Sequence, residues 1–239
     1  MSSNQNKTAY VTGGASGIGK ALVGMLVEKG ARVCIADFNI EAAKEWASEL
    51  NQKHGNDNVW AMEVDVSSWE SQVAAFEEAV KVFGRIDYVF PVAGIGERRA
   101  LPNRPNATGP FEKPDFAVMD VDGIGMIAIV GFVRTYGKIM AQENITLNAI
   151  CPGIVETGIS KHAPWYHAEA AKRGCLVEMD QMMAGFSMLM GAETMSGECV
   201  EVVAKHGARV VKFPTASLES EIGGEISYAR NRPFHDPIE

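Results

Sequence analysis

Tyr10-Val11-Thr12-Gly13-Gly14-Ala15-Ser16-Gly17-Ile18-Gly19 is the stretch that decides the fold of this chain. An apolar run that predicts a buried strand leads into a glycine-rich turn, and a helical pattern follows from Lys20. Gly13 permits the tight turn, Gly17 lets the backbone approach a phosphate, and Gly19 lets the helix pack close to the strand. The free N–H groups at the start of the helix then face the pyrophosphate of a dinucleotide. A plain strand-to-helix turn is the alternative.

An acidic residue at the end of the next predicted strand, 31–36, narrows the choice of nucleotide. Asp37 stands twenty positions after Gly17, which is the spacing at which a carboxylate meets the ribose hydroxyls of NAD. It would repel the 2′-phosphate of NADP, and no Arg or Lys stands beside it. The sequence therefore favours NAD over NADP. A strand-end turn residue, followed by Asn39, is the alternative interpretation of Asp37.

Composition restricts the remaining function classes. The chain has 239 residues and a net charge of −8, which favours one domain over 1–239 and disfavours nucleic acid or an anionic membrane as partner. The longest apolar run, 123–133, is too short to span a bilayer, and the polar first residues lack the core of a signal peptide. We expect a cytoplasmic protein. The four cysteines are not spaced for metal, so we expect reduced thiols and no metal site.

Strand and helix patterns alternate through the first ninety residues, which predicts parallel strands with helices on both faces of a sheet. After residue 37 the pattern predicts helices at 41–52 and 67–83 and strands at 59–64 and 86–90. Ser67 is the predicted N-cap of the second of these helices, and Gly84 is its predicted stop. Its predicted buried positions are Val73, Phe76, Val80 and Phe83.

The second half of the chain is predicted in coarser terms. Four prolines predict a loop at 97–114, and the polar tail at 212–239 is expected to be loosely attached. Between them the pattern predicts a strand at 146–149, one or two helices within 160–195, and a final strand at 197–204.

Four motifs together resemble those of the short-chain dehydrogenase/reductase family: 12–19, Asp65-Val66, Ala93-Gly94 and 148–153. The resemblance covers about 7–204 and is strongest to the NAD-dependent hydroxyprostaglandin-dehydrogenase-like branch and its fungal relatives, some of which serve secondary metabolism. It implies a three-layer, Rossmann-like, doubly wound parallel α/β sheet. It also implies NAD-dependent interconversion of a small secondary alcohol and its ketone, and a homo-oligomer is one arrangement that the family offers.

The resemblance also implies cofactor-binding roles, position by position. Ser16, Gly17, Ile18 and Gly19 would bind the pyrophosphate. The adenosine ribose would contact Asp37 and Phe38, and the adenine would contact Asp65 and Val66. The second ribose would lie beside Ala93 and Gly94, and the nicotinamide carboxamide would contact Ile154 and Thr157. The asparagines that the family carries before Ala93 are replaced here by Pro91 and Val92.

The catalytic set of the family is not found in this sequence. The family uses a Tyr four residues before a Lys, because the ammonium lowers the phenol pKa, and a Ser on the preceding strand. None of the five tyrosines has Lys four positions on, and no serine stands between Ser71 and Ser160. Tyr136 and Lys138 are two apart and so face differently on a helix. The family's asparagine on an earlier helix corresponds to Asp122. Catalytic residues therefore stay unassigned.

The length of the chain agrees with the loss of the catalytic residues. The family needs a helix, a strand and a second helix between Gly94 and Ile145, but only about fifty residues are present and the proline-rich loop takes about twenty of them. The sequence predicts that one central strand is missing or is replaced by 125–132, where a helix is favoured. Three hypotheses follow: an oxidoreductase, a non-catalytic NAD-binding or partner subunit (a pseudoenzyme), and a chain that does not fold stably.

Overall fold

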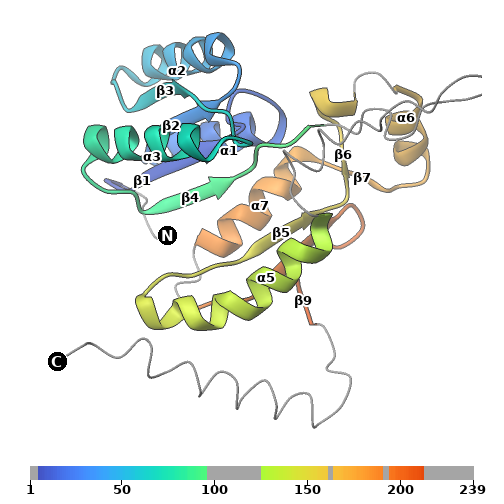
Figure 1. Cartoon of the computed structure of the whole chain (residues 1–239). Coiled ribbons are helices and arrows are strands. Elements are labelled where there is room, and N and C mark those ends of the chain that lie inside the picture. The colour runs from blue at the N-terminus through green and yellow to red at the C-terminus, as the bar shows by residue number, and fades with distance from the viewer. Residues whose placement is uncertain (1–4, 96–124, 161–163, 191–193, 213–239) are drawn as a thin grey trace, which may run out of the picture. The chain divides into compact units, whose positions relative to one another are not determined.

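The computed structural model describes residues 5–95, 125–160, 164–190 and 194–212 (Figure 1). These residues form two compact units. The first unit draws on Met1–Ile124 and Glu156–Ala168, and the second on Gly125–Val155 and Glu169–Glu239. The proline-rich loop at 97–114, Asp122 and the tail at 212–239, apart from Lys212, lie outside the described residues. The single domain over 1–239 stays a prediction.

The first unit is built on a parallel sheet with strand order β3-β2-β1-β4. Its strands are β1 (Thr8–Thr12), β2 (Arg32–Asp37), β3 (Val59–Glu63) and β4 (Tyr88–Pro91). Its helices are α1 (Gly17–Glu28), α2 (Ile40–His54) and α3 (Trp69–Phe83). Because the strands are parallel, their carboxyl ends meet at one edge of the sheet, where this architecture binds ligands.

Helices cover both faces of this sheet, since alternate residues of β1 and β2 pack in opposite directions. On one face Tyr10 and Cys34 form a buried cluster with Phe83 of α3. On the other face Ile35 and Val23 of α1 both lie beside Gly14. The predicted three-layer α/β fold is confirmed, and the strands are apolar because both of their faces are buried.

The start of α3 corrects the sequence prediction. Ser68, not Ser67, is the N-cap, and its hydroxyl accepts the Ser71 N–H at 3.2 Å. The Ser67 hydroxyl instead donates to the Asp65 carboxylate at 2.6 Å, and Ser67 lies one position before the N-cap. The predicted end is confirmed, because the helix stops at Phe83 and Gly84 follows with a left-handed φ of 78°.

The buried face of α3 differs from the predicted one by one position. Ala75, Ala79 and Phe83 are buried, whereas Phe76 is 39% and Val80 is 37% exposed. Small side chains at the seam let the helix lie close to the sheet, so the larger ones point to its rim. The predicted burial is right for Phe83 and wrong for Phe76 and Val80.

The second unit holds two further small sheets. β5 (Ala149–Pro152) pairs in parallel with β8 (Cys199–Val203), which pairs in antiparallel fashion with β9 (Gly207–Val211). β6 (Ile154–Val155) pairs with β7 (Leu176–Val177). The helical elements of the remaining described residues are α5 (Gly125–Met140), η1 (Ala141–Glu143), η2 (Gly158–Ser160), α6 (Pro164–Lys172) and α7 (Met179–Met190).

Side-chain hydrogen bonds explain why the strand predicted at 146–149 begins later. Leu147 N–H donates to the Ser196 hydroxyl at 3.0 Å, and the Asn148 amide donates to the Met195 carbonyl at 2.7 Å. These two residues are thereby held outside the strand ladder, which starts at Ala149 opposite Cys199. The sequence did not predict β9.

Segment 125–132 belongs to α5, so the favoured helix is confirmed and the substitute strand is wrong. Within the described residues, β4 is an edge strand whose one sheet neighbour is β1. No helix in the described part of the chain combines the length and the apolar character needed to cross a membrane.

Candidate functional site

The turn after β1 has no room for a side chain at Gly13. Gly13 has a φ of +69°, and a Cβ there would lie 2.6 Å from the Ala93 Cα. The Thr12 hydroxyl oxygen accepts the N–H groups of Val92 and Ala93, each at 3.2 Å. The turn after β4 is thereby fixed beside the glycine-rich turn, and Thr12 is a positioning residue to which the sequence analysis gave no role.

The N-terminus of α1 is open to an anion. Gly17 has a φ of +52°, and a Cβ on Gly19 would overlap the Gly13 carbonyl oxygen. Ser16 is the N-cap residue, is exposed, and makes no capping hydrogen bond through its side chain. The first turn, which includes the half-buried Ile18, carries no acidic residue. The first N–H groups of the helix and the positive end of its dipole are therefore available to a phosphate.

Asp37 links the end of β2 to the glycine-rich turn. Its Oδ2 accepts the Ala15 N–H at 3.0 Å and its Oδ1 accepts the Asn39 N–H at 2.9 Å. Oδ1 thus forms the strand-end turn with Asn39, and Oδ2 holds the glycine-rich turn through Ala15. Each carboxylate oxygen has a second lone pair that can accept a ribose hydroxyl. Phe38, the next residue, is 71% exposed.

Asp65 and Val66 follow β3 at the same edge of the sheet. The Val64 N–H donates to the Asp37 carbonyl at 3.1 Å, which ties the two strand ends together. The Asp65 carboxylate accepts both the hydroxyl and the N–H of Ser67, and these hydrogen bonds lower the pKa of Asp65. The carboxylate is therefore ionised and fixed in direction at neutral pH.

The predicted nicotinamide residues fall in different units. Thr157 lies in the first unit, where a Cβ built on Gly17 would come within 3.3 Å of the Thr157 Cβ. Ile154 lies in β6 of the second unit. Gly94 follows Ala93 and is exposed. The structure thus brings the glycine-rich turn, Asp37, Ala93 and Thr157 together within the first unit.

A hollow of about 470 Å³ contains the same threonine. It is lined by Glu156, Thr157, Gly158, Pro164 and His167. The His167 side chain is 9% exposed, and its Nδ1 lies 3.8 Å from Glu156 Oε1. Sequence reasoning missed this pair, because eleven positions separate the two residues and no local motif joins them.

The described tyrosines include one buried phenol, Tyr10, and one exposed phenol, Tyr136. Burial, reinforced by Cys34, raises the pKa of Tyr10 to about 12, so this phenol stays protonated. Tyr136 is 48% exposed and stacks on Phe132 with ring centroids 4.8 Å apart. Tyr228 lies outside the described residues. Across the part of the chain that the structure covers, no group of three or more metal-ligating side chains occurs.

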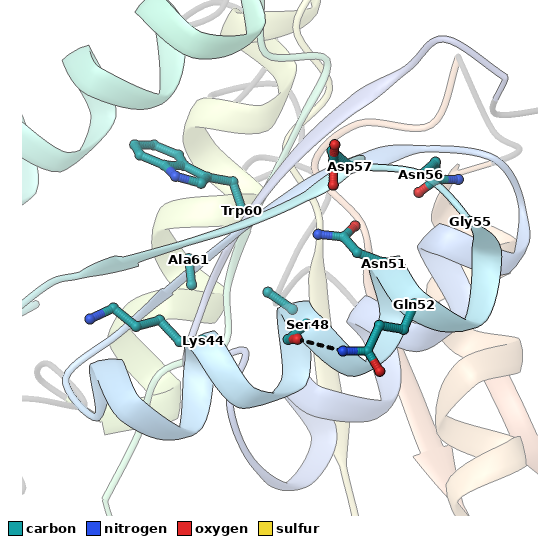
Figure 2. A pocket seen from close by; sticks show the side chains of 10 residues that line it. Lys44, Ser48, Asn51, Gln52, Gly55, Asn56, Asp57, Trp60 and Ala61 are labelled. Carbon is teal, nitrogen blue, oxygen red and sulfur yellow. Dashed lines mark hydrogen bonds between the residues drawn. The ribbon is translucent and has the colours of Figure 1, made fainter.

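A second hollow, of about 580 Å³, lies away from the glycine-rich turn (Figure 2). It is formed by α2 and the first residues of β3, and Figure 2 shows Lys44, Asn51 and Trp60 around it. The Asn51 amide is engaged with the Val59 main chain at 2.8 and 3.0 Å. Because β3 begins here, the hollow lies at the amino ends of the strands, opposite the predicted ligand edge.

Residues 7–116 match the family model described as short chain dehydrogenase. An uncharacterised oxidoreductase, YuxG, of Bacillus subtilis is 40% identical over 89 residues, which cover 37% of this chain and 13% of that protein. The short-chain dehydrogenase/reductase ascJ of Acremonium egyptiacum is 35% identical over 123 residues, covering 51% of this chain and 38% of that protein. This chain therefore spans well under half the length of these two relatives.

A longer match links the chain to 15-hydroxyprostaglandin dehydrogenase [NAD(+)] of Homo sapiens. It is 28% identical over 185 residues and covers 64% of this chain and 70% of that protein. Among solved structures, 3-ketoacyl-(acyl-carrier-protein) reductase from Brucella melitensis, complexed with NADH, has a TM-score of 0.69 at 19% identity. That match covers 86% of this chain and 100% of the other. At this identity the structural likeness supports the fold alone.

Proposed function

We propose that this chain, which matches the short-chain dehydrogenase family model over residues 7–116, is an oxidoreductase of that family and that its first unit binds NAD. The observation that carries this proposal is the glycine-rich turn, held by the Asp37 carboxylate on one side and by Ala93 on the other. A Cβ at Gly13 or at Gly19 would clash with the neighbouring backbone. Glycine at both positions therefore leaves the backbone open to close approach by the dinucleotide.

The residues present fit a dinucleotide. Ser16, Gly17, Ile18 and Gly19 offer main-chain N–H groups to the pyrophosphate, since no side chain caps α1. Asp37 offers lone pairs to the adenosine ribose, with Phe38 beside it. Asp65 and Val66 would flank the adenine, Ala93 and Gly94 the second ribose, and Thr157 the carboxamide. Ile154 belongs to the second unit, and its role toward the carboxamide stays a prediction. The negative Asp37 disfavours the 2′-phosphate of NADP.

The reaction that we propose is interconversion of a small secondary alcohol and the matching ketone. Bound NAD would supply the hydride acceptor. The human relative is named for NAD-linked oxidation of a hydroxyl group, which supports this class of substrate.

A second candidate function is a non-catalytic NAD-binding or partner subunit. The observation that favours it is the sequence itself, which has neither a Tyr four residues before a Lys nor a serine from 72 to 159. This candidate keeps the same nucleotide site and differs from the first only in turnover.

Calorimetry with NAD and NADP tests the nucleotide proposal, with Asp37→Asn as the variant. Hydrogen bonds to a charged group contribute about 1.5–3 kcal/mol, so we expect the Kd for NAD to rise roughly 10- to 100-fold. Asp57→Asn is the matched control, because Asp57 is an exposed carboxylate at the second hollow, beside α2. Binding of NADP more tightly than NAD by the unaltered chain would contradict the proposal, as would the absence of binding. Turnover with a panel of secondary alcohols separates the two candidates.

A further inference from the structure

Two cysteines of the second unit meet although they are far apart in the chain. Cys151 lies on β5 and Cys199 lies on β8, forty-eight positions later, and their thiols share a hydrogen bond. Both residues belong to the second unit, so their arrangement does not depend on the placement of the first. Spacing within the sequence could not reveal this pair, and the proposed nucleotide site does not use it.

The strand register sets the two cysteines too far apart for an ordinary disulfide. Across the parallel ladder Ala149 is the partner of Cys199, and Glu201 is the partner of Cys151, so the cysteines are diagonal neighbours on one face of the sheet. Cα atoms of diagonal neighbours are roughly 7–8 Å apart, whereas ordinary disulfides need about 4.4–6.8 Å. A direct sulfur–sulfur bond would therefore require the strands to move.

An ion placed between the two sulfur atoms can join them without that movement. Side chains in contact approach within about 4.5 Å. Two thiolate–metal bonds of about 2.3 Å each, the length seen with zinc, reach across about 4.6 Å. The contact between Cys151 and Cys199 thus has the span of a sulfur–metal–sulfur bridge.

The pair lies in an apolar cluster between the sheet and α5. Cys199 is 1% exposed and packs with Val133 and Ala149, whereas Cys151 is half-buried and packs at the edge of the same cluster beside Leu147. The apolar neighbours keep water from the inner sulfur atom, and the outer sulfur atom gives an ion a way in. A buried thiol next to a half-buried one therefore supplies both a dry site and access to it.

Burial and nearby charges decide the protonation of the pair. Burial raises the pKa of both thiols, so both hold their protons at neutral pH. Arg134 of α5 favours a thiolate at Cys199, while Glu198 and Glu201 of β8 oppose the thiolates at Cys199 and Cys151 respectively. α7 packs on the opposite face of this sheet. A cation that binds here must displace two protons.

We propose that Cys151 and Cys199 bind one soft monovalent cation, Cu(I), between their sulfur atoms. Soft thiolate ligands select Cu(I), which accepts two ligands, whereas structural zinc takes four. Within the ranges that the structure describes, no group of three or more metal-ligating side chains occurs, so the two-ligand ion fits this pair better. On binding, two S–H bonds break, two S–Cu bonds form and two protons pass to water. Copper stays monovalent, so the step needs neither oxidant nor reductant.

Titration of the full chain with Cu(I) in competition with bicinchoninate, without oxygen and with ascorbate present, tests this site. We expect one Cu(I) per chain and a thiolate-to-copper absorption band in the ultraviolet. Cys151→Ala and Cys199→Ala should each lower the affinity at least about 100-fold, because each removes one of two ligands. Cys175→Ala is the matched control and should leave the affinity unchanged, because Cys175 is an exposed cysteine of the same unit.

The dependence of Cu(I) affinity on pH reports how many thiols coordinate the ion. If both lose a proton on binding, the affinity should rise about 100-fold from about pH 6.5 to about pH 7.5, against about 10-fold for one. Circular dichroism checks that each variant is folded. Should the buried Cys199→Ala not fold, Cys151→Ala and the pH dependence still decide the question.

The site and the nucleotide proposal are tested independently, since Cys151→Ala should leave the calorimetric Kd for NAD unchanged. One Cu(I) per chain, lost in the two alanine variants and released with two protons, supports the inference. No bound Cu(I), binding that survives Cys151→Ala, loss of binding in Cys175→Ala or the slope of a single proton would each overturn it.

Discussion

At the scale of one residue, Asp87 holds the first unit together at the end of the sheet opposite the predicted ligand edge. Its side chain is 5% exposed and accepts the Thr8 N–H at 2.9 Å and the Thr8 hydroxyl at 3.1 Å, while Lys7 and Arg85 pair with it from outside. Burial alone would raise the pKa of Asp87, but these hydrogen bonds outweigh it and lower the pKa. The carboxylate therefore fastens the start of β1 to the start of β4.

Replacing Asp87 by Ala should lower the free energy of unfolding by about 2 kcal/mol, because the Thr8 N–H is left without its buried acceptor. The loss should depend on pH. Since the folded chain lowers the pKa of Asp87, the folded state binds fewer protons than the unfolded one, and the stabilisation is present above about pH 4 and fades below it. Urea unfolding of both chains from pH 3 to pH 7 checks this. A difference that stays constant over this range would contradict it, and Asp57→Ala is the exposed control.

At the scale of an element, the start of α3 depends on the hydrogen bonds of two adjacent serines. Ser68 caps the helix through Ser71 N–H, whereas Ser67 is bonded to Asp65 in the predicted adenine region. Two adjacent serines thus have separate tasks, one for helix stability and one for the ligand edge.

Ser68→Ala should therefore cost about 1 kcal/mol of stability, the usual effect of losing an N-cap, and leave NAD affinity unchanged. Ser67→Ala should lower NAD affinity and leave stability unchanged, because it removes the hydroxyl hydrogen bond to the Asp65 carboxylate while the Ser67 N–H and the cap at Ser68 remain. Urea unfolding and calorimetry on the two variants give the comparison. Equal effects on stability would mean that the cap is shared.

At the scale of the whole molecule, the two units can be followed separately. All four tryptophans fall in the first unit: Trp46, Trp60, Trp69 and Trp165. Tryptophan fluorescence therefore reports on the unit that carries the nucleotide site, whereas far-ultraviolet circular dichroism reports on both.

NAD at about 100 times its Kd should stabilise the unit that binds it by about 2.7 kcal/mol. We expect the fluorescence transition to move to higher urea by the corresponding amount, and part of the dichroism change to stay where it was. If both signals move together, the chain unfolds as one cooperative domain, as the sequence predicted for 1–239.

The sequence determined the features that depend on neighbouring residues. The glycine-rich turn, the carboxylate at Asp37 and the helix stop at Gly84 could be predicted, because φ, strand periodicity and capping are set within a few positions. The family match over 7–116 rests on the same local patterns.

Only the tertiary structure decided which side chains meet across long separations. It placed Thr157 against Gly17 and brought His167 to 3.8 Å from Glu156. A hydroxyl, carboxylate or imidazole bonds to whichever partner the packed elements bring within reach. Periodicity records which face a residue occupies, whereas the identity of its partner is fixed only when distant segments fold together.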